Sequence, residues 1–156
     1  MYMHLPDLVE TRFAASISAA SISGSPEVVT SFGTDSISMP LCRIQTESAS
    51  ELPDSSGNFM FNVKIEVLGS VDYSTGGDLA AQIQAHQKCV GAIFDHITSI
   101  NISSLSGGAN FAGSSTASTN SIEIYHARVA GLERDNDTAE GLLVDTINLE
   151  IYANEA

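Results

Sequence analysis

The chain has 156 residues, of which 43% are hydrophobic, so it is long enough and apolar enough to fold as one domain with its own core. Nineteen acidic residues oppose six basic ones, giving a formal net charge of −13 and too few clustered Lys and Arg to hold nucleic-acid phosphates or an anionic membrane. On charge alone, acidity that only keeps the protein soluble is the simpler interpretation, and the charge is also compatible with a surface past which DNA moves without sticking.

The first predicted element is a helix over residues 6–20. Pro6 suits the first turn of a helix, where a backbone N–H has no carbonyl to bond. The apolar residues that recur at helical spacing are Leu5, Leu8, Val9, Phe13 and Ile17. The sequence leaves two alternatives for residues 21–38. They form either two short edge strands, at 27–30 and 36–38, or an ordered loop.

The next two elements are predicted to be strands on either side of an acidic turn. Residues 39–46 contain Leu41 and Ile44 as apolar anchors and lead into a turn-rich stretch over 47–58. Over residues 59–68 the chain then alternates between two sets of side chains, which is the pattern of a half-buried strand. The set that we expect to face the core is Phe59, Phe61, Val63, Ile65 and Val67.

A second helix is predicted over residues 78–98, and Asp78 is a plausible cap for its N-terminus. One stripe of mostly apolar residues steps by three or four along about five turns of this helix. The stripe consists of Leu79, Ile83, His86, Val90, Ile93, Phe94 and Ile97. We expect it to pack on the sheet face formed by Phe61, Val63 and Ile65.

The stretch from Ile97 to Ile122 contains no Asp, Glu, Lys or Arg. It predicts a long Ser/Gly-rich loop at about 101–121, and loops of that length are uncommon unless they are functional. Its large apolar residues Leu105 and Phe111 could dock on a neighbouring subunit. Alternatively, the segment could be a mobile linker.

Two closing strands are predicted over residues 121–132 and 142–152, joined by a charged hairpin tip over 133–141. The apolar face changes near His126, and a β-bulge is one way to produce that change. The order of elements is then α-β-β-α-β-β. We therefore expect a single α+β domain over residues 1–156, with an antiparallel four-stranded sheet and both helices packed on one face.

The Cys and His residues form no complete catalytic or metal-binding set. Cys42 and Cys89 are too few for a disulfide framework, and we expect both to be reduced core residues. His86 and Cys89 could act as base and nucleophile on the second helix. No orienting third group or oxyanion donor is evident, so packing explains their spacing better. His4, His126 and the two cysteines are too scattered for a zinc site.

Two acidic clusters invite functional interpretations, and they consist of Asp135, Asp137 and Glu140, and of Glu47, Glu51 and Asp54. The first resembles a fragment of a calcium loop but lacks the Gly and the bidentate Glu that complete one. The second could supply paired carboxylates for glycoside hydrolysis, but no aromatic platform accompanies it and the chain has no Trp. Phosphate-loop, dinucleotide and G-x-S-x-G motifs are absent. We expect a protein that is not an enzyme and needs no metal or cofactor.

The chain does not open on a basic segment followed by a long apolar run, as a signal peptide would. No stretch approaches the roughly 18 consecutive apolar residues of a membrane span. We therefore expect a soluble protein that is made in a reducing cytoplasm and has no membrane partner.

A series of short segments in the middle of the chain forms a recognisable pattern. They are Pro-Leu-Cys-Arg-Ile at 40–44, Glu-Leu-Pro at 51–53, Gly-Asn-Phe at 57–59 and Val-Lys-Ile-Glu-Val at 63–67, followed by Asp72 and a helix that carries His86. The pattern resembles the small proteins at the head–tail neck of long-tailed bacteriophages, chiefly the tail terminators. The similarity covers residues 5–100 in order and the final hairpin more loosely, whereas the stretch at 101–121 departs from the shorter connection of that family.

The resemblance implies a structural virion protein of the tail or neck, assembled in the host cytoplasm. It implies a homo-oligomeric ring of six subunits that caps the tail tube. Such a ring meets the tail tube protein and a head–tail connector or stopper protein, and lets genomic DNA pass without tight binding. The candidates for facing the lumen are the two acidic clusters, either the tip with Asp135, Asp137 and Glu140 or the turn with Glu47, Glu51 and Asp54. The alternatives are another neck, minor tail or head-completion protein, or a small-molecule-binding or enzymatic α+β domain.

Overall fold

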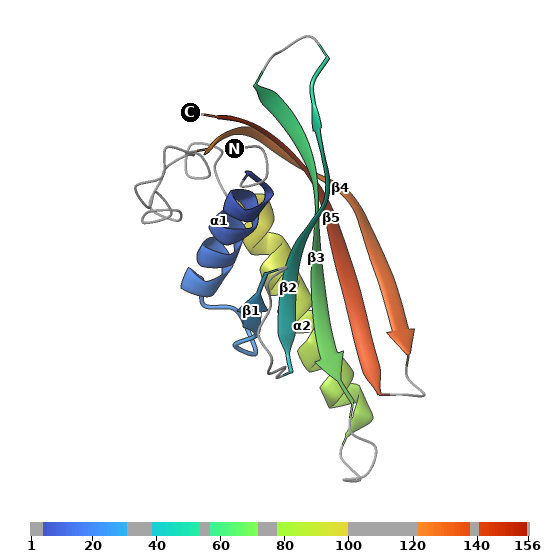
Figure 1. Cartoon of the computed structure of the whole chain (residues 1–156). Coiled ribbons are helices and arrows are strands. Elements are labelled where there is room, and N and C mark those ends of the chain that lie inside the picture. The colour runs from blue at the N-terminus through green and yellow to red at the C-terminus, as the bar shows by residue number, and fades with distance from the viewer. Residues whose placement is uncertain are drawn as a thin grey trace.

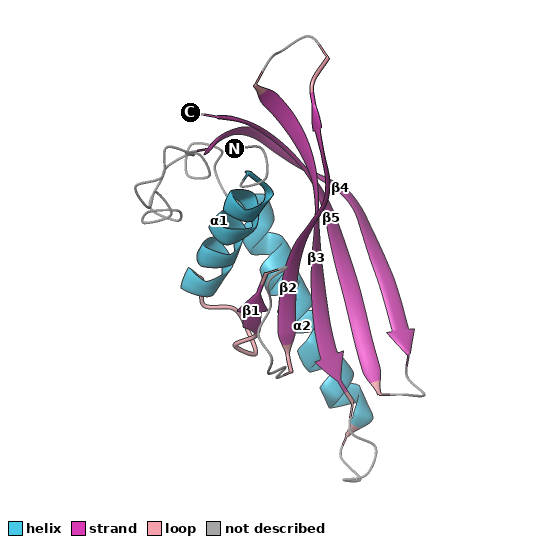
Figure 2. Cartoon of the chain, in the orientation of Figure 1, coloured by secondary structure: helices cyan, strands magenta, loops and turns pink. Residues whose placement is uncertain are grey.

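The computed structural model describes residues 5–30, 39–53, 57–71, 78–99, 122–137 and 141–155. Two helices and one sheet make up this part of the chain, and both helices lie on the same face of the sheet (Figures 1 and 2). The helices are α1 (Leu5–Ala19) and α2 (Leu79–Ser99). The strands are β1 (Glu27–Val29), β2 (Leu41–Glu51), β3 (Asn58–Ser70), β4 (Ile122–Asp137) and β5 (Leu142–Glu155). The expected α+β architecture is therefore confirmed.

The sheet has five strands in the order β1-β2-β3-β5-β4, so the prediction of four strands in an α-β-β-α-β-β order is wrong. The additional strand is β1, whose three residues pair in parallel with Leu41, Cys42 and Arg43 of β2. Its sequence was ambiguous because Ser, Gly and Pro surround it, and three residues are too few for a periodic pattern. Only the long-range pairing with β2 makes it a strand.

Both hairpins are longer than the sequence predicts. Strand β2 continues through a register shift between Thr46 and Ser48 and pairs with β3 as far as Glu51. At this bulge the buried Glu10 side chain of α1 accepts a hydrogen bond from the Thr46 backbone N–H at 3.0 Å. Strand β4 likewise continues to Asp137 and crosses two register shifts. One of them, between Ile124 and His126, confirms the predicted change of face.

The core lies between the sheet and the helices. The alternation predicted for β3 is confirmed, because the side chains of Phe59, Phe61, Val63, Ile65 and Val67 are all buried. They form one cluster with residues of both helices and of β5, among them Phe13 and Ile93, which are at most 1% exposed. This cluster also confirms that α2 packs on Phe61, Val63 and Ile65.

Helix α2 begins where Asp78 caps it, since the Ala81 backbone N–H donates to Asp78 Oδ1 at 3.3 Å. The predicted stripe is confirmed from His86 onwards, with His86, Ile93 and Ile97 buried. Leu79 is 41% exposed, so the prediction is wrong in the first turn. None of the described helices is long and apolar enough to cross a membrane.

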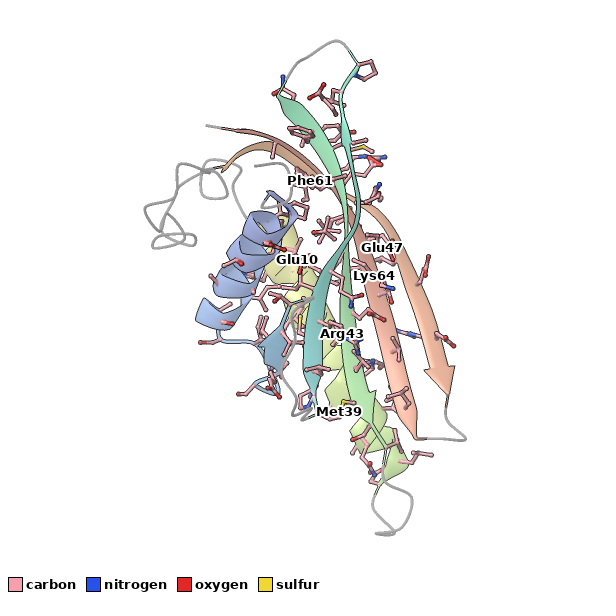
Figure 3. The ribbon with its side chains drawn as sticks, viewed as in Figure 1. Glu10, Met39, Arg43, Glu47, Phe61 and Lys64 are labelled. Carbon is pink, nitrogen blue, oxygen red and sulfur yellow. The ribbon has the colours of Figure 1, made fainter. Side chains whose placement is uncertain are left out.

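The other face of the sheet is not covered by either described helix. Its side chains are polar and half-buried along most of β3, and they form ion pairs across the strands. Figure 3 shows one such pair, in which Glu47 lies beside Lys64 with 3.3 Å between Oε1 and Nζ. A second pair joins Arg128 and Glu150 through two hydrogen bonds of 2.7 and 3.1 Å. We call this surface the open face.

Candidate functional site

A buried histidine and a buried aspartate hold α2 to the sheet. His86 Nε2 lies 2.9 Å from Asp145 Oδ1, and Arg134 donates from Nε to Asp145 Oδ2 at 3.0 Å. His86 belongs to the buried stripe of α2, and Asp145 lies on the helix-facing side of β5. Arg134 and Asp145 are direct partners in the β4–β5 register. One carboxylate therefore joins a helix and two strands.

Gly69 of β3 makes room for the histidine ring. A Cβ placed on Gly69 would lie 2.6 Å from His86 Nδ1, which is closer than real Cβ contacts allow. Within the described part of the chain, Nδ1 is buried and has no hydrogen-bond partner. Leaving a buried polar atom unpaired costs free energy. The position of the His86 ring is therefore not held by Nδ1. It is held by the contact of Nε2 with Asp145 and by the space that Gly69 leaves.

A groove of about 430 Å³ lies directly beside this cluster. It runs between α2 on one side and strands β4 and β5 on the other, and we call it the α2–β4 groove. Its apolar lining comes from Val90, Phe94, Leu132 and Ile147, and its polar lining includes Arg134 and Asp145. Leu132 is 61% exposed, which is unusual for a large apolar side chain next to a cavity.

The surroundings of the two cysteines disfavour the thiolate form that nucleophilic chemistry needs. Burial raises the pKa of the Cys42 thiol to about 12, and the neighbouring Cys89 adds to this effect. Burial also raises the pKa of Cys89. A nucleophilic cysteine needs the opposite, a lowered pKa that favours the thiolate. The raised pKa of Cys89 therefore disfavours the nucleophile–base role beside His86, and Cys89 itself lies in the core cluster.

This pKa shift makes a testable prediction. Near neutral pH the Cys42 thiolate should be roughly a thousandfold rarer than that of an ordinary thiol, so iodoacetamide should label neither cysteine in the folded protein. Urea-unfolded protein is the control and should take two labels. Because the unfolded chain loses the Cys42 proton at lower pH, the free energy of unfolding should fall as pH rises from about 9 towards 12. Rapid labelling of the folded protein would contradict the buried placement.

The structure separates the two acidic clusters that the sequence singled out. Glu47 and Glu51 are exposed on β2, not in a turn, and Asp135 is exposed near the end of β4. Asp137 is the last residue of β4. Asp54, Glu140, Leu105 and Phe111 lie outside the described residues.

The separation follows from the register. Glu51 pairs with Phe59 of β3, whereas Asp135 pairs with Val144 of β5, which pairs with Leu68 of β3. Nine residues separate these two positions on β3, and a strand rises about 3.3 Å per residue, so Glu51 and Asp135 are roughly 30 Å apart, whereas Glu47, at the bulge opposite Asn62 and Val63, lies nearer to Asp135. Figure 1 shows the two hairpin ends pointing in opposite directions. The clusters do not form one site.

Sequence reasoning placed His86 on the buried stripe but missed its partners. Asp145 was a detectable signal, because it interrupts the buried alternation of Leu143, Ile147 and Leu149 on β5. A carboxylate at such a position needs a buried donor. Across the described residues, no group of three or more His, Cys, Asp or Glu side chains gathers as a metal site requires.

Comparison of the chain with models of known protein families and with curated proteins finds no match.

Proposed function

We propose that this chain is the subunit of a ring that caps the tail tube of a long-tailed bacteriophage and joins it to the head connector. The observation that carries the proposal is how the segments resembling tail terminators are arranged. The segments at 40–44 and 63–67 are paired strands, with Cys42 opposite Val67 and Ile44 opposite Ile65. The helix with His86 packs on the same hairpin. Segments far apart in the sequence thus form one continuous unit.

The surfaces of this unit favour repeated contacts between copies. Strand β4 is the last in the sheet order and pairs with β5 on one side only, within the described residues. The open face is likewise left uncovered by α1 and α2 (Figure 1). A ring needs a heterologous contact between two different patches of the same subunit, and edges and open faces can supply both patches.

The charge distribution supports a lumen that lets DNA pass. Three of the six basic residues, Arg43, Lys64 and Arg128, lie on the open face, and Lys64 and Arg128 have carboxylates already beside them. Such cations are neutralised within the subunit and offer little to phosphate groups. The exposed carboxylates Glu47, Glu51 and Asp135 remain candidates for the lumen wall, at two different heights along the strands.

This proposal predicts that the protein does not hold DNA. Labelled duplex at about 50 and 200 mM salt should show no binding that weakens as salt rises, because such weakening reports Lys and Arg contacts to phosphates. The matched variants are Glu150→Gln, which releases Arg128, and Glu47→Gln, which leaves Lys64 with only its longer ion pair of 3.9 Å to Glu66. Both should gain weak, salt-sensitive binding if the open face lines the lumen. Strong salt-sensitive binding by the unaltered protein would contradict the proposal.

Electron microscopy of the purified protein tests the ring itself. We expect annular particles with a central channel wide enough for duplex DNA, and in an assembled neck the same ring at the end of the tail tube. Solid particles without a channel, or a position away from the neck, would reject the proposal.

A second candidate function is supported by the α2–β4 groove. Its volume of about 430 Å³ lies in the range of small-molecule sites, and it combines apolar walls with one guanidinium. A small molecule that raises the Tm of the unaltered protein, but not of Leu132→Glu, would favour a ligand-binding domain over a ring subunit.

A further inference from the structure

We propose that the α2–β4 groove receives the β2–β3 hairpin end of a neighbouring copy of this chain. The inference rests on the proposed ring and names the contact that would close it. The hairpin end is the segment from Glu51 to Pro53, and it projects past both helices in Figure 1. Three features of the groove and the hairpin end support the pairing.

The first feature is the apolar wall of the groove. Among the described residues Leu132 is the most exposed of the large apolar side chains, at 61%, and it stands beside Val90 and Phe94 of α2. By the strand register Leu132 lies opposite Ile147, whose side chain faces the helices, so α2 leaves this end of β4 uncovered on its apolar side. An apolar wall open to solvent and rimmed by polar groups is typical of a contact surface.

The second feature is the exposure and hydrogen bonding of the Arg134 guanidinium. Its side chain is 55% exposed, and its one bond within the described residues runs through Nε to Asp145. Arg128 differs, because both its Nε and Nη2 bind Glu150. The buried His86–Asp145 pair therefore holds the Arg134 guanidinium in place, and no other described residue uses its outer fork. A guanidinium fork binds a carboxylate through two parallel bonds, so an acidic partner would complete it.

The third feature is the chemistry of the hairpin end. It offers an exposed carboxylate, Glu51, directly before the half-buried Leu52 and the exposed Pro53. A backbone bond of 2.8 Å from the Leu52 N–H to the Asn58 carbonyl fixes its shape. A carboxylate beside a compact apolar pair matches a groove with a guanidinium beside an apolar wall.

The hairpin end cannot reach the groove of its own molecule. Glu51 pairs with Phe59, and Asp145 of the groove pairs with Val67, eight residues further along β3. The two sites are therefore roughly 26 Å apart along the strands. A contact between them must join two copies through two different surfaces, and such contacts close into rings when the rotation allows. The contact would place Glu51 at the subunit interface and leave Asp135 as the lumen candidate.

A mixing experiment tests the contact with two variants that leave the core intact. Leu132→Glu places a carboxylate in the apolar wall of the groove and leaves the hairpin end unchanged. The double variant E51K/P53K spoils the hairpin end and keeps the groove, and both of its positions are exposed. Each variant alone should be monomeric by native mass spectrometry, with association weakened by roughly tenfold or more. Mixed together, they should form a dimer with one copy of each, joined through the single intact groove and hairpin end.

Leu79→Glu is the matched control, because Leu79 is also an exposed large apolar residue, at 41%, but lies outside the groove. It should assemble as the unaltered protein does. Rings that persist in both groove and hairpin variants would overturn this contact and leave the ring proposal standing. Two monomeric variants that form no mixed dimer would also overturn the contact. An unaltered protein that is monomeric would overturn both.

Discussion

Replacing Ile93 with Ala should lower the free energy of unfolding by about 2–5 kcal/mol. Ile93 is 0% exposed and lies in the core cluster with Phe61 and Ile65, so the smaller side chain leaves a cavity between α2 and the sheet. Urea denaturation followed by circular dichroism measures the change. Ile83→Ala is the matched control on the same helix, because Ile83 is only half-buried and should lose less. An unchanged stability for Ile93→Ala would mean that this face of α2 does not pack on the sheet.

Gly69→Ala should lower the free energy of unfolding by about 1–3 kcal/mol, because the new methyl group overpacks against the His86 ring. The ring can retreat only by stretching its 2.9 Å contact with Asp145. In an open strand position the same change would be favourable, since Gly in a strand interior is less stable than Ala by about 0.5–1 kcal/mol. The sign of the effect therefore reports the clash.

A double-mutant cycle isolates that clash. In a His86→Ala background the obstacle to a Cβ at Gly69 is removed, so Gly69→Ala should become neutral or stabilising. A similar loss of stability in both backgrounds would show that another neighbour of Gly69 causes it. The cycle needs only that His86→Ala still folds, and its own loss of stability does not enter the comparison.

The elements with long periodic patterns were predictable from the sequence, because burial on one face imposes the period. The alternation from Phe59 to Val67 and the stripe from His86 to Ile97 are both confirmed as core faces. The ends of the strands were not predictable. Glu47 and Glu51 look like turn residues, but the bulge after Thr46 and the bond to Glu10 of α1 keep them in β2. These interactions join positions far apart in the sequence.

The candidate site was predictable only in part for the same reason. His86 belongs to a local pattern, whereas its partner Asp145 comes 59 residues later. Arg134 reaches Asp145 only because the β4–β5 register, with its two shifts, places them opposite each other. A one-residue change in that register would turn Arg134 to the other face of the sheet. The groove depends on the same register, so no pattern in the sequence could have indicated it.

The strand register also decides where the two acidic clusters lie in the proposed ring. In the sequence, the cluster with Glu51 and the cluster with Asp135 are equivalent candidates for a lumen wall. The structure places Glu51 and Asp135 toward opposite ends of the strands, with Glu47 between them, so one orientation of the subunit in a ring gives Glu51 and Asp135 different roles. If the α2–β4 groove holds the hairpin end of a neighbouring copy, Glu51 lies at the contact between copies and Asp135 is left as the candidate for the lumen.

Native mass spectrometry of the unaltered protein tests the central claim most directly. The measurement gives the number of copies in the assembled particle without labels or partners. We expect one dominant species at six times the mass of the single chain, stable on dilution, with no open-ended series of larger masses. A monomer or a dimer as the dominant species would contradict a closed ring and with it the proposed role at the end of a phage tail.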